Sequence, residues 1–276
     1  MEHIENAVAL HYANVGLLGR IIGGLEAVGA DFDNLKTADL APVDEFHIGG
    51  REATAAAVDR MSLNADHRVL DIGCGIGGAS RYIAETIGCR VDGIDLTPEY
   101  VLTAKALTEM IGLEDKVSHE IASALAMPFD DDVFDAAITF HVAMNIPQRD
   151  VFYREIGRVL KPGGTLCLYD VMKIGDTPVT YPMPWAQSIE TSHLTTISET
   201  SALLTEAGFI VIEVDDRTAG SIEFFERMSA AKTGGAPPPL GVHLAMGADA
   251  AEKIGNARRC IEQGEMAPVM MIARRA

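Results

Sequence analysis

One segment of the chain places a carboxylate beside several glycines, in a pattern that could bind a nucleoside. It reads Val69-Leu70-Asp71-Ile72-Gly73-Cys74-Gly75-Ile76-Gly77-Gly78. Because glycine has no Cβ, the backbone at Gly73, Gly75 and Gly77 can turn sharply and approach a ligand closely. We expect a buried strand before this turn and a helix over about 79–87 after it, with its positive N-terminus directed at the ligand.

Two classes of cofactor fit these glycines. Gly73, Gly75 and Gly78 also satisfy the Gly-x-Gly-x-x-Gly pattern of dinucleotide-binding proteins. Asp71, however, stands two residues before the first glycine, where a carboxylate would repel a pyrophosphate and attract a cationic amino-acid group. Farther along, Leu160-Lys161-Pro162-Gly163-Gly164 predicts a turn between the end of a helix and the start of a strand.

Together, these two segments resemble the class I S-adenosylmethionine-dependent methyltransferases. The resemblance covers about residues 67–171 and extends to Phe46-His47-Ile48-Gly49-Gly50. Within the family, the chain is similar to small-molecule methyltransferases of the sarcosine/dimethylglycine and ubiquinone-pathway types. The resemblance implies an α/β, Rossmann-like fold whose mostly parallel sheet has helices on both faces and an antiparallel last strand. It also implies S-adenosyl-L-methionine as the cofactor.

An acidic residue, Asp95, ends the second expected strand. A carboxylate at this position can accept two hydrogen bonds from ribose hydroxyls in either class of cofactor. It could instead cap the helix that Thr97 and Pro98 begin, where the hydroxyl and the proline are both typical of a helix start. With the ribose on Asp95, Leu96 would pack against the adenine.

The resemblance implies a cofactor site built from several segments. Many relatives carry a carboxylate where Ser123 stands, so a hydroxyl or backbone groups would have to bind the adenine here. His47 and Gly49 resemble part of a lid over the cofactor, and Tyr12 could close the same site. The predicted cofactor-binding residues are Tyr12, His47, Gly49, Asp71, Gly73, Cys74, Gly75, Gly77, Asp95, Leu96, Ser123, Ala124, Phe140 and His141.

His141 is the candidate catalytic residue because it follows the fourth expected strand, where folds of this kind carry reactive loops. Two roles fit it. The imidazole could act as a general base, since it titrates near neutral pH, or it could only position the methionine end of the cofactor. Phe140 is expected to pack against the cofactor.

The acceptor pocket is expected in the segments that interrupt the alternation of strands and helices. Aromatic side chains there could hold a methylated amine by cation–π attraction, or they could line an apolar pocket. Ordinary core packing is the alternative for each of them. The candidate residues are Met144, Tyr181, Trp185, Phe225, His243 and Met246.

Composition narrows the class of partner. The 276 residues carry a formal net charge of −18, which would repel nucleic acid. Four scattered cysteines, with no matching histidine spacing, predict neither a metal site nor a disulfide framework, and they favour a reducing cytoplasm. The sequence shows neither an export signal nor a membrane span. We expect a small-molecule acceptor, and a homodimer is compatible with the sequence.

The order of expected elements predicts two regions. Residues 1–62 are expected to form an N-terminal helical cap or lid, and residues 63–276 a methyltransferase domain with lid insertions at about 172–197 and 218–262. Seven strands are expected near 67–72, 90–95, 117–121, 134–140, 164–171, 209–215 and 267–274. The last of them is expected to join the sheet edge, antiparallel beside 209–215.

The expected function is methyl transfer from S-adenosylmethionine to a nitrogen, oxygen or carbon of a small molecule, by in-line displacement. An NAD(P)-dependent oxidoreductase that uses the same glycine turn is one alternative. A non-catalytic protein that only binds the cofactor is another.

Overall fold

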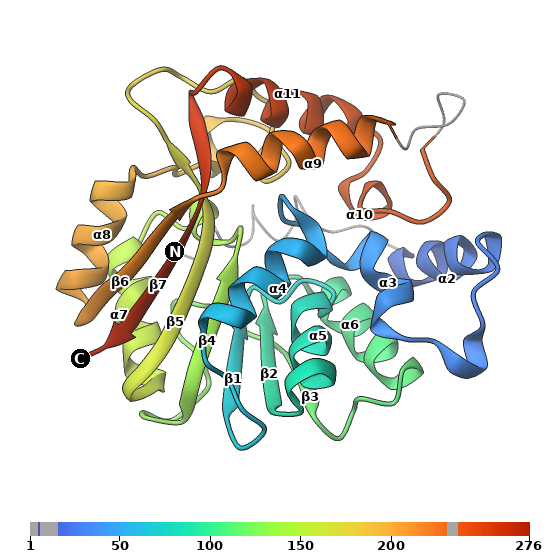
Figure 1. Ribbon diagram of the computed structural model, residues 1–276, viewed down its shortest axis with the longest axis horizontal. Helices are drawn as coiled ribbons and strands as arrows, with labels where there is room; N and C mark the ends of the chain where they lie inside the picture. The colour runs from blue at the N-terminus through green and yellow to red at the C-terminus, as the bar shows by residue number, and fades with distance from the viewer. Residues whose placement is uncertain (1–4, 6–15, 231–236) are drawn as a thin grey trace.

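The computed structural model of the protein describes residue 5, residues 16–230 and residues 237–276. At its centre lies a seven-stranded sheet in the order β3-β2-β1-β4-β5-β7-β6 (Figure 1). Neighbouring strands are parallel except at β7, which runs antiparallel to both β5 and β6. The strands are β1 Arg68–Ile72, β2 Arg90–Asp95, β3 Val117–Ile121, β4 Phe134–Phe140, β5 Leu160–Lys173, β6 Phe209–Asp216 and β7 Met266–Arg275.

The position of the last strand corrects the sequence-based expectation. β7 is antiparallel beside β6 as expected, but it lies inside the sheet between β5 and β6, and β6 forms the edge. The burial of the two strands gives the reason. The first eight residues of β7 are all buried, as a strand covered on both faces requires, whereas Ile210, Ile212 and Val214 of β6 are exposed.

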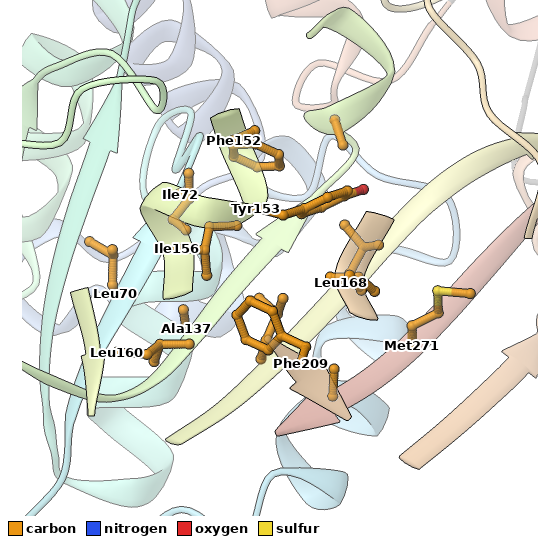
Figure 2. Close-up of a cluster of buried hydrophobic side chains, with 14 of the residues drawn as sticks. Leu70, Ile72, Ala137, Phe152, Tyr153, Ile156, Leu160, Leu168, Phe209 and Met271 are labelled. Atoms are coloured by element: carbon orange, nitrogen blue, oxygen red, sulfur yellow. The ribbon is translucent and has the colours of Figure 1, made fainter. Parts of the chain in front are cut away.

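Helices cover both faces of the sheet, and the alternation of side chains along each strand decides which face a residue joins. Leu70 and Ile72 point into a cluster with Phe152 and Ile156 of α7 (Figure 2). Val69 points to the opposite face, against α4 and α5. The helices of these layers are α4 Gly50–Arg60, α5 Gly78–Ile87, α6 Pro98–Met110, α7 Arg149–Val159 and α8 Ile197–Glu206.

A second group of helices lies beyond the carboxyl ends of the parallel strands. Figure 1 shows α9, α10 and α11 across that end, and we call these three helices the roof. Their bounds, with those of the N-terminal helices, are α2 Leu17–Ala27, α3 Thr37–Asp44, α9 Thr218–Ala230, α10 His243–Met246 and α11 Ala250–Glu262. Short 3-10 helices occupy Phe32–Asn34, Ala143–Asn145 and Ile189–Thr191. Over the described part of the chain, no helix combines the length and apolar character that crossing a membrane requires.

Candidate active site

A cavity of about 780 Å³ opens where the parallel strands end. Its floor includes the turn after β1, the end of β2 and the end of β4, and its upper walls come from α3, the 45–52 segment and the roof. Ligands of open α/β sheets bind at this edge, and pockets for small molecules have volumes of about 300–1,000 Å³. The cavity is therefore the candidate active site.

The glycine turn after β1 forms one wall of the cavity. Gly73 and Gly75 both have positive φ values, 74° and 54°, and both line the cavity. Their surroundings differ: a Cβ on Gly73 would lie 2.3 Å from a methyl of Val142, whereas a Cβ on Gly75 would meet only the Phe46 ring, 3.6 Å away. Gly73 thus permits close packing, and Gly75 keeps the cavity wall free of side-chain atoms.

Asp95 joins the glycine turn to the start of α6. Its Oδ2 accepts a hydrogen bond from the backbone N–H of Gly75 at 3.0 Å, and its Oδ1 accepts one from Thr97 N–H at 2.8 Å. The Thr97 hydroxyl makes no cap hydrogen bond, so the carboxylate replaces it at this helix start. Each carboxylate oxygen has a second lone pair, so Asp95 can still accept hydrogen bonds from a ligand in the cavity.

Beyond Asp95, apolar side chains and one carboxylate line the cavity. Leu96 and Ala124 both line the cavity. Ser123 does not line the cavity, and its hydroxyl donates a hydrogen bond to the carboxylate of Glu5, which does. Glu5 therefore places a carboxylate on the cavity beside Ser123.

Three predicted cofactor residues lie behind the glycine turn and do not line the cavity. Asp71 is buried and accepts a hydrogen bond from the Ser80 hydroxyl at 2.6 Å, because it points to the same face of the sheet as Val69, under α5. Cys74 and Gly77 are also buried, and both pack against the ring of His119. These residues support the shape of the turn from behind. Tyr12 lies outside the described residues.

Burial has a strong effect on the Asp71 carboxyl. It raises the pKa of Asp71 to about 7, and the hydrogen bond from Ser80 opposes this only in part. The group therefore titrates near neutral pH, while ordinary aspartate is fully ionised there.

His141 lies at the end of β4 in a backbone conformation that is rare for residues other than glycine, with φ 55°. Its N–H donates to the Tyr169 carbonyl at 2.7 Å, which fixes the backbone, while neither ring nitrogen has a hydrogen-bond partner. The ring lines the cavity. A buried imidazole with two unpaired nitrogens has the capacity to bind a polar group of a ligand.

A second histidine stacks on the first. The His47 ring lies 6.0 Å from the His141 ring, and its Nε2 is 3.1 Å from both the Gly50 carbonyl and the Thr54 hydroxyl. Burial lowers the pKa of His47 to about 4. Burial and the neighbouring His47 also hold the pKa of His141 well below its usual value. Both rings are therefore neutral at pH 7, and each neutral ring has one donor and one acceptor nitrogen.

A buried ion pair fixes α3 beside the glycine turn. The Arg81 guanidinium of α5 donates to Asp44 Oδ1 of α3 at 2.6 Å, and neither side chain is exposed. The same guanidinium donates to the Ile76 carbonyl of the turn at 2.7 Å. The helix that forms one upper wall of the cavity is thus bound directly to the turn that forms its floor.

The predicted acceptor residues mostly gather at the other end of the cavity. Met144, Trp185 and Phe225 are buried there in one apolar cluster. His243 and Met246 line the cavity from α10, which packs against α2, α3 and α11. Tyr181 packs beside them without lining the cavity.

Several polar residues at the site were missed by the sequence analysis. Glu45 is buried and paired with Arg51 at 3.3 Å, and it accepts a hydrogen bond from Thr54 at 2.8 Å. Asn145 donates to the carbonyls of Trp185 and Thr191, both at 2.9 Å, and so holds the 184–191 segment beside the end of β4. No local pattern marks Asn145, because its partners lie 40 and 46 residues away in sequence. Among the residues that the structure describes, no group of three or more His, Cys, Asp or Glu side chains could hold a metal ion.

Comparisons with known proteins agree with this architecture. Residues 70–168 match a family model described as a methyltransferase domain. Methyltransferase GfsG from Streptomyces halstedii is 32% identical over 181 residues, which are 64% of this chain and 65% of that protein. Phosphoethanolamine N-methyltransferase 1 from Arabidopsis thaliana is 30% identical over 65% of this chain and 36% of its own length. The chain thus spans about two thirds of the first relative and about a third of the second.

Solved structures share the fold across nearly the whole chain. The [4+2]-cyclase SpnF superposes with a TM-score of 0.69 at 22% identity, covering 94% of this chain and 92% of the cyclase. Geranyl diphosphate C-methyltransferase from Streptomyces coelicolor A3(2), solved with S-adenosyl-L-homocysteine, has a TM-score of 0.66 at 18% identity, covering 82% and 78%. Residues 70–168 therefore match a methyltransferase-domain family, and the fold is shared with a solved C-methyltransferase.

Proposed function

We propose that the protein transfers a methyl group from S-adenosylmethionine to a small molecule bound in the same cavity. The observation that carries this proposal is the shared cavity itself. One end has the Gly75 wall and the Asp95 carboxylate, and the other end has a separate set of apolar side chains. The methyltransferase-domain match over residues 70–168 supports the choice of cofactor.

Two features of the site fit S-adenosylmethionine. The bare backbone at Gly75 forms a cradle that a Cβ would enter, and Asp95 can accept hydrogen bonds from ribose hydroxyls. Leu96 and Ala124 would bracket the adenine, and the Glu5 carboxylate, beside Ser123, could accept from its amino group. Asp71 would act indirectly, by supporting the turn from behind through its hydrogen bond from Ser80.

The protein's main task in this reaction is positioning. The bound sulfonium supplies an already activated methyl group, so the residues must align the acceptor with it and exclude water. Alignment of this kind contributes about 7–11 kcal/mol to lowering a barrier. The His141 ring, with both nitrogens unpaired, is the polar group that meets the acceptor between the two ends of the cavity.

Net charge and the state of the cysteines support a small-molecule acceptor and a cytoplasmic location. A net charge of −18 disfavours nucleic acid as the acceptor, and all four cysteines are buried free thiols, as in a reducing cytoplasm. A homodimer would appear in light scattering as twice the mass of one chain.

Calorimetry with S-adenosylhomocysteine and NAD tests the cofactor. We expect S-adenosylhomocysteine to bind and NAD to give no measurable heat. Tight NAD binding without S-adenosylhomocysteine binding would instead support an oxidoreductase. Radiolabelled S-adenosylmethionine then separates an enzyme from a non-catalytic binding protein, because only the enzyme moves the labelled methyl group to an acceptor.

A further inference from the structure

Apolar side chains from three distant parts of the chain line part of the cavity. We call this part the acceptor side, and it comprises Val171, Trp185, Phe225, Met228, Met246 and Ile254. Trp185 and Phe225 are buried, and the single indole N–H of the chain donates to the Ser192 hydroxyl at 3.0 Å. The acceptor side therefore offers a ligand apolar contact and no indole donor.

The charged side chains around the acceptor side already have partners. Arg227 at the rim pairs with Glu52 at 2.8 Å, and Lys253 pairs with Asp249 at 3.1 Å and donates to the Met246 carbonyl. Near His47, Arg51 pairs with the buried Glu45. A phosphate or carboxylate on the acceptor would have to break one of these pairs, and an ammonium would have to compete with Arg51 or Arg227 for Glu45 or Glu52. Either arrangement is costly in an apolar cavity.

His141 is a polar residue of the cavity lining whose ring nitrogens have no partner within the protein. Both ring nitrogens of His141 lack hydrogen bonds, and the ring is held in place by the Tyr169 carbonyl and by stacking on His47. The rings packed against it are those of Tyr169 and His47, which are neutral at pH 7, so the His141 ring remains uncharged. A neutral imidazole accepts a hydrogen bond from a hydroxyl, and a hydroxyl is itself neutral at this pH.

We propose that the acceptor is an uncharged, largely apolar alcohol whose hydroxyl donates to the His141 imidazole, so that the reaction is O-methylation. This inference rests on the proposed function. In the reaction, the hydroxyl proton passes to the imidazole, the oxygen forms the new bond to the methyl carbon, and the electrons of the broken carbon–sulfur bond stay on sulfur. One positive charge leaves the sulfonium and one appears on the imidazole, which later releases its proton to water. The apolar cavity therefore never has to hold a second charge.

The lone tryptophan provides a binding assay that needs no turnover. Trp185 fluorescence is followed while the protein, saturated with S-adenosylhomocysteine, is titrated with decanol, decyl phosphate or decyltrimethylammonium, which share one chain and differ in the head group. We expect decanol to bind at least about tenfold more tightly than either charged probe, a difference of about 1.4 kcal/mol. Equal or tighter binding of either charged probe would overturn the proposal.

Two variants sharpen the test. Met246→Arg places an unpaired cation on the acceptor side, so it should improve decyl phosphate binding at least about tenfold. Ile189→Arg adds the same charge at an exposed residue outside the cavity and should change nothing. Unchanged decyl phosphate binding in a folded Met246→Arg protein would contradict the assigned lining.

The His141 contact has its own readout. His141→Ala should weaken decanol binding while leaving the binding of decane, which has no hydroxyl, unchanged. Equal loss for both probes would show that the ring only shapes the cavity. Absence of S-adenosylhomocysteine binding in the parent protein is a different result, because it would refute the proposed function itself.

Discussion

Alanine substitutions in the glycine turn should affect fold stability and ligand binding to different extents. Gly75 has a positive φ and a Cβ there would enter the cavity, whereas Gly73 has a positive φ and a Cβ there would strike Val142 at 2.3 Å. Gly112 has a similar φ of 67° with no atom within 4 Å of its Cβ position. Alanine at these three positions therefore isolates backbone strain, core packing and ligand contact.

The expected magnitudes follow from these distances. Alanine in the left-handed region costs about 1–2 kcal/mol, so Gly112→Ala and Gly75→Ala should each lower the free energy of unfolding by about that amount. Gly73→Ala adds overpacking against Val142, at about 1–3 kcal/mol, for a total of about 2–5 kcal/mol. Only Gly75→Ala should combine a small stability cost with an increase of at least about tenfold in the dissociation constant of S-adenosylhomocysteine.

Urea unfolding followed by Trp185 fluorescence gives the stabilities, and calorimetry gives the dissociation constants. Adding Val142→Ala to Gly73→Ala should recover most of the unfolding free energy lost to overpacking, while the loss from backbone strain remains. If Gly75→Ala binds S-adenosylhomocysteine as tightly as Gly112→Ala does, the Gly75 wall is not where the cofactor lies.

Three further predictions concern charged groups at the site. The Asp71 carboxyl has a pKa of about 7 in the folded protein and about 3.8 in the unfolded chain, so it destabilises the folded protein as pH rises between these values. Asp71→Asn removes this effect. In parallel urea titrations, its free energy of unfolding should gain on the order of 4 kcal/mol relative to the parent between about pH 4 and about pH 8. A constant difference across this range would show that Asp71 is ionised in the folded protein. Arg81→Ala leaves Asp44 buried and unpaired and should cost about 3–5 kcal/mol of unfolding free energy, whereas the double variant Arg81→Met, Asp44→Leu should cost less; equal losses would mean that packing dominates. Asp95→Asn keeps the shape and loses one acceptor, so calorimetry should show S-adenosylhomocysteine binding weakened about tenfold, and unchanged binding would exclude a ribose contact.

The elements of the fold were predictable because their signals are local. Apolar runs ended by glycine or proline gave all seven strands to within a few residues, although β5 begins four residues before the predicted start at 164 and includes the turn at Pro162. The place of β7 inside the sheet was missed. That position depends on which strand is buried on both faces, and the sequence does not show it because the exposed side chains of β6 include the apolar Ile210, Ile212 and Val214.

The candidate site was predictable where one segment supplies both the motif and its geometry. Gly75, Asp95 and His141 lie on the cavity as expected from their places after strands. Asp71 does not, because the alternation of β1 turns it under α5, and a motif gives no such direction until the strand is placed against its helices. The carboxylate of Glu5 was missed for a different reason, since it reaches Ser123 across 118 residues of sequence.

A crystal structure with S-adenosylhomocysteine bound would test the central claim most directly. We predict that the ribose hydroxyls lie within hydrogen-bond distance of the Asp95 carboxylate, that the adenine contacts Leu96, and that the sulfur faces the acceptor side beside His141. A nucleoside bound elsewhere, or a sulfur turned away from the acceptor side, would contradict methyl transfer in this cavity.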